Sequence, residues 1–147
     1  MRILSLALLY WIWPVAYMVL IFLLSSSPLT GKIPPIWIYQ DKIIHFVEYG
    51  ILAFLLARAL TGPDSTPKPW RPGAALLLAV VFGISDEIHQ SMVPGRDASF
   101  TDLLANTVGA MAGVLLWTIL VHRWATIRKK NAIIPTASED GVQEGEK

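Results

Sequence analysis

Four long apolar segments run along the chain, and polar or proline-rich stretches separate them. A helix needs about 20 predominantly apolar residues to cross the hydrocarbon core of a bilayer. We therefore predict an all-α fold, a polytopic membrane protein built as a bundle of about four transmembrane helices. The expected spans are Ile3–Leu24, Ile43–Leu60, a third that begins at Gly73 and stays apolar through Ile84, and Leu103–Val121.

The first and last spans carry features of their own. Pro14 should kink the first helix, which bilayers tolerate when neighbouring groups satisfy the freed carbonyl. This segment has an alternative interpretation as a cleaved signal peptide, because Ser25–Ser27 supplies small residues. A retained span is favoured, because the apolar run exceeds a usual signal core and its early aromatics are typical of an interfacial belt. The last span contains Gly109-x-x-x-Gly113, a spacing that permits close helix packing.

The connecting segments Pro28–Gln40 and Gly62–Pro72 are rich in proline and cannot continue a helix. Only one compact domain fits, because four spans occupy more than half of the 147 residues. We assign the transmembrane domain to residues 1–130. Residues 131–147 are small, polar and acidic, and we expect them to form a disordered cytoplasmic tail.

Composition narrows the classes of function. The chain is 54% hydrophobic and 16% charged, whereas a soluble domain is closer to a quarter charged, so membrane lipids are its expected surroundings. The formal net charge of +1 provides no field that would recruit nucleic acid. The absence of cysteine excludes disulfides, thiolate metal sites and a cysteine nucleophile.

Lysine and arginine in the loops predict the orientation. With both termini in the cytoplasm, the inner segments carry Arg2, Arg58, Lys68, Arg71, Arg123, Arg128, Lys129 and Lys130, and the outer ones carry Lys32, Lys42 and Arg96. Cytoplasmic loops are the ones enriched in these residues, so the cytoplasmic placement of both termini is favoured. The chain is then a multi-pass protein of a cell membrane.

Ionisable residues gather where the second span begins, the third ends and the fourth begins. His45, Glu48 and Tyr49 lie three and four residues apart and share a helix face, as do Asp86, His89 and Gln90 on the third span. The predicted topology places all of them at the outer leaflet, where they form a candidate polar pocket. Its residues are Asp41, Lys42, His45, Glu48, Tyr49, Asp86, Glu87, His89, Gln90, Arg96, Asp102 and Asn106.

Simpler structural roles remain open for several of these residues. Asp41 precedes a helix, and Ser99 with Asp102 resembles a capping box, so both acids are candidates for capping helix amides. Lys42 and Arg96 are candidates for snorkelling toward lipid headgroups, and Tyr49 for an ordinary interfacial aromatic.

Glu48, Asp86 and Glu87 are harder to explain as surface residues. A carboxylate within a span costs about 2.5–3.5 kcal/mol on insertion scales unless it is paired or hydrated. Either these acids pair with His45, His89 or Arg96 to stabilise the bundle, or they serve a function, which we favour. The spacing predicts that His45 or Glu48 lies within hydrogen-bonding reach of Asp86 or His89.

The chemistry of this group is compatible with more than one role. His45-x-x-Glu48 and Asp86-x-x-His89 offer nitrogen and oxygen ligands for a metal. No diagnostic metal or serine-nucleophile motif is present, however, so we expect no metal and no cofactor. General acid–base catalysis needs only proximity and suitable proton affinities, and it stays open.

The same residues give the chain a resemblance to a known family. The features are S-S-P-L at 26–29, D-K-x-x-H-F-x-E-Y at 41–49, D-E-x-H-Q at 86–90 with P-G-R at 94–96, and D-x-x-A-N-x-x-G at 102–109. In order and spacing they resemble the VanZ-like family of small bacterial membrane proteins, whose founding member lowers susceptibility to the glycopeptide antibiotic teicoplanin. The resemblance implies a protein of the bacterial inner membrane that acts in the cell envelope.

Two functional hypotheses follow. In the first, the outer-face pocket binds a lipid headgroup or a glycopeptide-like ligand, and Lys42 and Arg96 attract an anionic group while the histidines and acids supply hydrogen bonds. In the second, the chain is a membrane-embedded enzyme acting on a lipid-linked envelope substrate by acid–base or metal-assisted chemistry. A transporter is less favoured, because the inner halves of the spans lack matching polar groups. Homo-oligomerisation stays open.

Because the chain has no cysteine, introduced cysteines report the topology without background. Cysteines at Lys32 and Ala98 should react with a membrane-impermeant maleimide added to intact cells, and one at Ser65 should react only after permeabilisation. Labelling of intact cells at Ser65 alone would reverse the assigned orientation.

Overall fold

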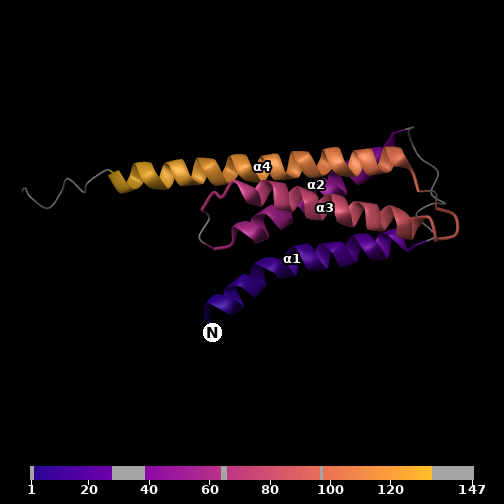
Figure 1. Ribbon diagram of the computed structural model, residues 1–147, viewed down its shortest axis with the longest axis horizontal. Coiled ribbons are helices and arrows are strands. Elements are labelled where there is room, and N and C mark those ends of the chain that lie inside the picture. Colours follow the sequence, from indigo (N-terminus) through magenta and orange to yellow (C-terminus); the bar gives the residue numbers. More distant parts are fainter. Residues whose placement is uncertain (1, 28–38, 64–65, 97, 134–147) are drawn as a thin grey trace, which may run out of the picture.

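The computed structural model describes residues 2–27, 39–63, 66–96 and 98–133 (Figure 1). Within these ranges the chain forms four α-helices and no strand: α1 (Arg2–Ser25), α2 (Gln40–Thr61), α3 (Trp70–Gln90) and α4 (Phe100–Ile133). Each is long and apolar enough to cross a membrane. The predicted all-α, four-span fold is confirmed. Most of the expected loop at 28–40, and the expected tail from residue 134 onward, lie outside the described residues.

The helices extend beyond the apolar segments that predict them. α3 continues through its polar end to Gln90, and α4 continues past Val121 to Ile133. Hydropathy indicates which part of a helix contacts lipid, whereas a helix ends where a residue such as proline or glycine interrupts the helical backbone. After α3 the break is a turn at Pro94 and Gly95, and Gly95 has a φ of 84°, a conformation that favours glycine.

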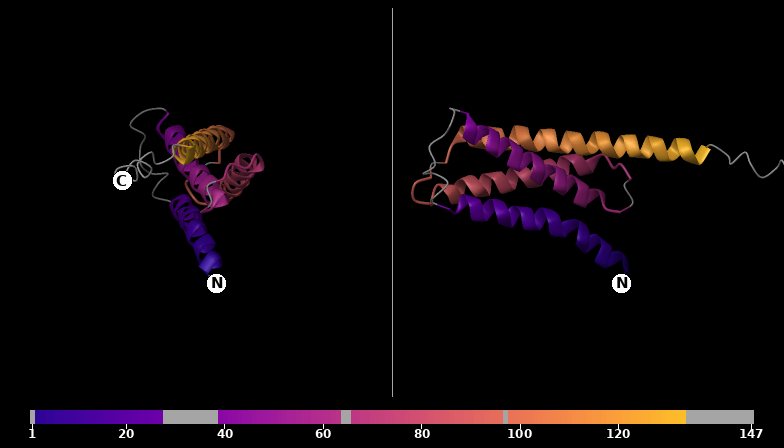
Figure 2. Two further views of the ribbon diagram at one scale, coloured as in Figure 1. Left: turned by 90° about the vertical axis from the view of Figure 1, so that its left-hand side faces the viewer. Right: turned by 180° about the vertical axis from the view of Figure 1, so that it is seen from behind.

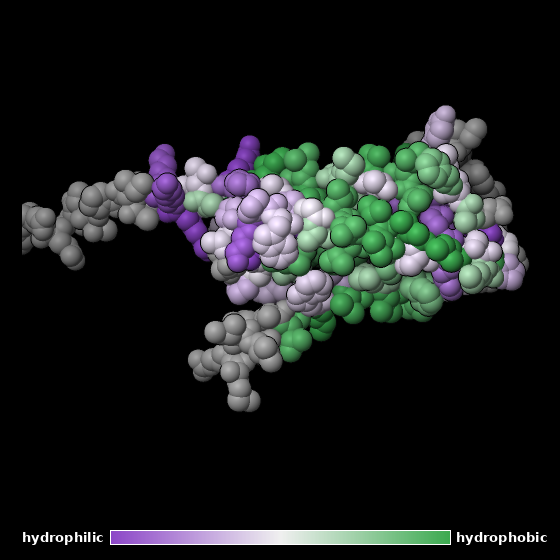
Figure 3. Space-filling model, viewed as in Figure 1, coloured by the Kyte–Doolittle hydropathy of each residue, from purple (hydrophilic) through white to green (hydrophobic). Residues whose placement is uncertain are grey.

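The polarity of the bundle's surface suits lipid around its middle and water at its ends. An apolar belt covers the middle of the molecule, and polar side chains gather at both ends (Figure 3). The exposed apolar side chains come from all four helices and include Leu23, Ile51, Leu77 and Leu115. An all-round apolar exterior of this kind indicates contact with membrane lipids.

α2 is the central helix, and it packs against α1, α3 and α4 (Figure 2). Its buried face includes Tyr49, Leu52 and Ala53, none of which is exposed. Alanines of the neighbouring helices meet this face, among them Ala79 and Ala110, which are also fully buried. Small side chains let membrane helices approach closely, because lipid gives little hydrophobic drive for their association.

The most extensive packing joins α2 and α4, and glycines make it possible. A Cβ atom built on Gly109 would lie 2.1 Å from the carbonyl oxygen of Phe46, and one on Gly113 would lie 2.0 Å from that of Gly50. Both obstacles are backbone atoms, which cannot rotate away. The close packing expected from Gly109-x-x-x-Gly113 is therefore present.

α1 curves away from the bundle toward its N-terminus (Figures 1 and 2). Pro14 lies inside this helix, and its ring is fully buried. A proline removes one backbone donor and crowds the carbonyl four residues earlier, here that of Tyr10, so the helix bends at this point. The C-terminal half of α1 stays against α2 and α3 and delivers Ser25 and Ser26 to the polar end of α3.

Gly113→Ala should destabilise the fold, because the added methyl group forces α2 and α4 apart. Overpacking of this kind costs about 1–3 kcal/mol, and a backbone obstacle places the effect at the upper end. Thermal unfolding in detergent measures the loss as a lower Tm.

Gly73→Ala is the matched control, because a Cβ atom added at this position would meet nothing within 4 Å and alanine favours the helix. Its Tm should stay unchanged or rise slightly. Equal Tm values for the two variants would show that the glycine contact does not hold the bundle together.

Candidate functional site at the polar end of the bundle

The expected pocket residues lie at one end of the bundle, where α1 and α3 end and α2 and α4 begin (Figure 1). Nine-tenths or more of His45, Tyr49, Asp86, Glu87, Gln90, Asp102 and Asn106 is buried. We call these seven residues, together with Asp41, Lys42, Glu48, His89 and Arg96, the polar cluster. Buried polar groups of this kind require partners, and most of them find partners within the cluster.

Asp86 is the centre of one half of the polar cluster. Its Oδ2 accepts hydrogen bonds from Ser25 Oγ (3.0 Å), Tyr49 OH (3.3 Å) and Gln90 Nε2 (2.7 Å). Gln90 Nε2 also donates to Ser25 Oγ (3.1 Å), and Gln90 Oε1 accepts from Arg96 (2.8 Å). This carboxylate therefore ties α1, α2 and α3 together, with the loop after α3 held through Gln90.

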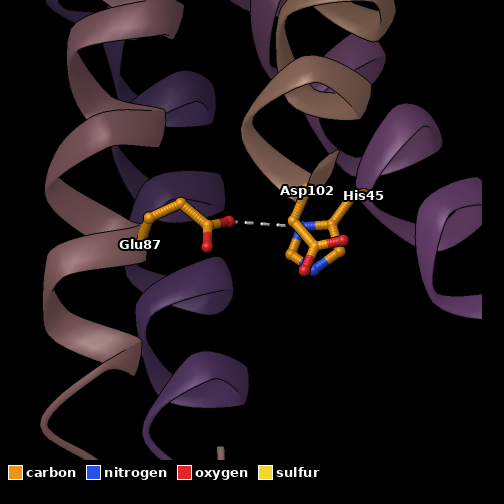
Figure 4. Close-up of side chains that lie close together, drawn as sticks. All are labelled: His45, Glu87 and Asp102. Carbon is orange, nitrogen blue, oxygen red and sulfur yellow. Dashed lines mark ion pairs between the residues drawn. The ribbon is translucent and has the colours of Figure 1, made fainter. Parts of the chain in front are cut away.

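His45, Asn106 and Glu87 form the other half, between α2, α4 and α3. His45 Nδ1 lies 3.0 Å from Asn106 Oδ1, which requires the hydrogen to be on Nδ1. Asn106 Nδ2 donates to Glu87 Oε1 (3.3 Å), and the same oxygen lies 4.0 Å from His45 Nδ1 (Figure 4). If this imidazole is neutral, its Nε2 is left as an acceptor.

Lys42 links two acids at the edge of the cluster. Its ammonium group pairs with Asp41 at 2.9 Å and also contacts Asp102. The Asp41 side chain is 57% exposed, so water screens its pair, whereas Asp102 is 8% exposed. Only half of the capping box considered for Ser99 and Asp102 is formed. Ser99 Oγ accepts from the Thr101 amide (3.2 Å), but the Ser99 amide donates to Glu87 (3.3 Å) and Asp102 binds Lys42.

One predicted contact is wrong. Among the described residues, no hydrogen bond or ion pair joins His45 or Glu48 to Asp86 or His89. The longer Tyr49 side chain, one residue further along α2, reaches Asp86 instead. Helical spacing identifies the face that carries a residue, but the length of each side chain decides which one crosses to the next helix.

Glu48 and His89 lie at the margins of the polar cluster. Glu48 is half-buried and forms no hydrogen bond or ion pair within the part of the chain that the structure describes. His89 is stacked on Phe22 with ring centroids 4.4 Å apart, and its Nε2 lies 2.9 Å from Ser26 Oγ. α1 thus takes part in the site through Phe22 and its terminal serines.

The serines at the end of α1 were missed by sequence reasoning. Ser25 is buried and binds both Asp86 and Gln90, and Ser26 binds His89. The sequence signal was their position, since they end the first span at the same level at which the other spans become polar. Small residues at this position are also typical of a signal-peptide cleavage site, which is the interpretation that the sequence suggests for them.

A divalent cation could be held by His45, Glu87 and Asp102. One ligand atom from each lies within 4.8 Å of the others, and the three side chains converge from α2, α3 and α4 (Figure 4). One imidazole and two carboxylates suit a borderline or hard divalent metal. This set shares only His45 with the ligands considered from sequence. Lys42 beside Asp102 already supplies a positive charge, so the arrangement can accept a metal without requiring one.

The polar cluster has more acids than permanent cations. Its acids are Asp41, Glu48, Asp86, Glu87 and Asp102, and its permanent cations are Lys42 and Arg96. Both cations already have partners within the cluster, Asp41 and Asp102 for Lys42 and Gln90 for Arg96. This end of the bundle therefore offers a ligand mainly hydrogen-bond acceptors.

These features define a class, that of small polytopic α-helical membrane proteins with a buried polar cluster inside one end of the bundle. Comparison with known families gives the particular assignment. Residues 4–121 match the family model described as VanZ/LLP1, and the chain belongs to this family. The match includes most of α1, all of α2 and α3, the first two-thirds of α4 and every residue of the polar cluster. Comparison with curated proteins and with solved structures gives no match.

Proposed function

We propose that this protein binds the polar headgroup of a membrane lipid, or a glycopeptide-like ligand, at the polar cluster. The cluster then faces the outside of a bacterial cell membrane, both termini are cytoplasmic, and binding alters the response of the cell envelope to that ligand. The chain acts in this proposal as a binding protein and not as a transporter.

Acceptor groups without partners are the observation that carries the proposal. Asp86 Oδ1 is buried and has no hydrogen-bond partner among the described residues, although Oδ2 of the same carboxylate has three. Glu48 has no partner within those residues either. A buried acceptor left unpaired costs about 1–3 kcal/mol, and more when it is charged. Donors on a ligand would remove this cost.

The balance of acids and cations supports a ligand rich in hydrogen-bond donors. Lys42 and Arg96 suggested an anionic group when the sequence was considered alone, but both side chains are engaged by partners. The groups that have no partner among the described residues are the hydrogen-bond acceptors Asp86 Oδ1 and the Glu48 carboxylate. They favour a headgroup with an ammonium group or several hydroxyl or amide donors, such as ethanolamine or an amino-bearing glycopeptide.

Glu48→Gln separates ligand binding from folding, because Glu48 forms no internal hydrogen bond among the described residues. The variant should keep or slightly raise the wild-type Tm, because it removes a charge that has no partner among the described residues, and it should bind phosphatidylethanolamine roughly 10- to 100-fold more weakly. This range corresponds to the loss of one charge-assisted hydrogen bond, about 1.5–3 kcal/mol. Native mass spectrometry against phosphatidylethanolamine, phosphatidylcholine and teicoplanin provides the measurement.

Ser85→Ala is the control for this experiment, since Ser85 is exposed and its hydroxyl donates to the Phe82 carbonyl of its own helix. Its binding should match that of the wild type. If Glu48→Gln binds every ligand as tightly as the wild type does, the headgroup site is not at the polar cluster.

A second candidate function is catalysis on a lipid-linked envelope substrate. The convergence of His45, Glu87 and Asp102 favours it, because these groups could act as acid and base or hold a metal. Incubation of the wild-type protein with lipid-linked substrates, with and without Zn²⁺ or Mn²⁺, decides between the two functions. Sustained turnover supports the enzyme, and binding without turnover supports the headgroup site.

A further inference from the structure

A cavity of about 260 Å³ lies at the opposite end of the bundle from the polar cluster. It is a partly open hollow between α1, α2 and α4, and its lining includes Tyr10, Arg58, Trp117, Trp124 and Arg128. Arginine and large aromatic side chains therefore surround a space that no residue of the polar cluster reaches.

The cavity carries positive charge, and the described residues provide no counter-ion for it. Arg58 lies in the last turn of α2 and is half-buried, with its guanidinium 5.2 Å from the centroid of the Tyr10 ring. Among the described residues, neither Arg58 nor Arg128 forms an ion pair, and no acid is in the cavity lining. An arginine within a span is expensive unless it meets an anion or water, so the cavity favours an anion.

The bend in α1 gives the cavity its shape. Pro14 turns the N-terminal half of α1 away from the bundle, and Tyr10 lies one helical turn before this proline. Tyr10 contacts Arg58 from one side, while Trp117 and Trp124 lie on α4 at the other. The ring nitrogen of Trp117 donates a hydrogen bond to Thr61 Oγ1 (2.9 Å), which holds this side chain against α2.

We propose that this cavity binds the headgroup of an anionic phospholipid, whose phosphate charge no headgroup cation neutralises, in the leaflet at this end of the bundle. Arginine matches phosphate because its planar fork donates parallel hydrogen bonds. Basic pockets between transmembrane helices are suited to anionic lipid headgroups. With both termini in the cytoplasm, this leaflet is the inner one.

The surroundings favour a lipid over a free phosphate ion. Tyrosine and tryptophan, which line the cavity, are typical of the depth at which headgroups lie. Leu9 and Leu116 are more than half exposed on the helices that flank it, so acyl chains attached to a bound headgroup have an apolar surface to follow. A neighbouring cavity of about 220 Å³ shares Trp117 and Val121 and adds the permanent cations Lys68 and Arg71, which extend the positive surface along the interface.

The test compares lipid binding to the full-length protein in nanodiscs of phosphatidylcholine with and without phosphatidylglycerol. The wild type should select phosphatidylglycerol, and Arg58→Gln and Arg128→Gln should each weaken its binding about 10-fold or more, as expected for loss of a charge-assisted hydrogen bond. Arg123→Gln removes the same charge from an exposed site on α4 outside the cavity lining and should leave binding unchanged.

The same experiment includes controls for misfolding of a variant and for lipid binding at the polar cluster. Arg128 is exposed, so its variant tests the cavity even if Arg58→Gln fails to fold. Glu48→Gln should keep phosphatidylglycerol binding, which separates this site from the proposed headgroup site at the other end. Three results would each overturn the proposal. The first is an equal loss of phosphatidylglycerol binding in Arg123→Gln and Arg128→Gln, and the second is equal binding of phosphatidylglycerol and phosphatidylcholine by the wild type. The third is displacement of phosphatidylglycerol by inorganic phosphate at the same concentration.

Discussion

The structure depends on the direct backbone contact between α2 and α4. At Gly109 and Gly113 the helices lie so close that a single methyl group would collide with a carbonyl of α2. Side chains one and two turns toward the polar end are thereby brought within hydrogen-bonding distance, so that His45 meets Asn106 and Lys42 meets Asp102. In a bilayer this proximity decides stability, because a polar group without a partner has no water to bind.

The close approach of α2 and α4 brings the polar cluster together, but only some of its hydrogen-bonding groups have partners. Asp86 binds three donors with one oxygen and none with the other within the described residues, and Glu48 has no partner there. If the cluster served only to hold the helices together, unpaired acceptors would be a pure cost. The excess of acids over engaged cations therefore supports a donor-rich ligand at this end. At the other end, arginines that form no ion pair within the same described ranges support an anion.

Hydropathy and charge in the sequence predicted the four helices and the end of the bundle at which the ionisable residues gather. Particular contacts could not be predicted, because helical spacing defines a face but not the rotation of one helix against the next. Tyr49 reaches Asp86 in place of Glu48. In the candidate metal set, His45 is joined by Glu87 and Asp102 and not by Glu48, Asp86 and His89. Ser25 was not predicted because an uncharged serine at the end of an apolar span costs little without a partner, whereas a carboxylate there requires one.

Infrared difference spectroscopy tests the central claim most directly, namely that the unpaired carboxylate oxygens of the polar cluster receive the donors of a headgroup. The protein is compared in membranes of phosphatidylethanolamine and of phosphatidylcholine. The account predicts a shift in the carboxylate stretching bands between the two lipids, part of which disappears in Glu48→Gln. Binding of phosphatidylethanolamine with an unchanged carboxylate spectrum would contradict it, because the headgroup would then lie elsewhere on the molecule.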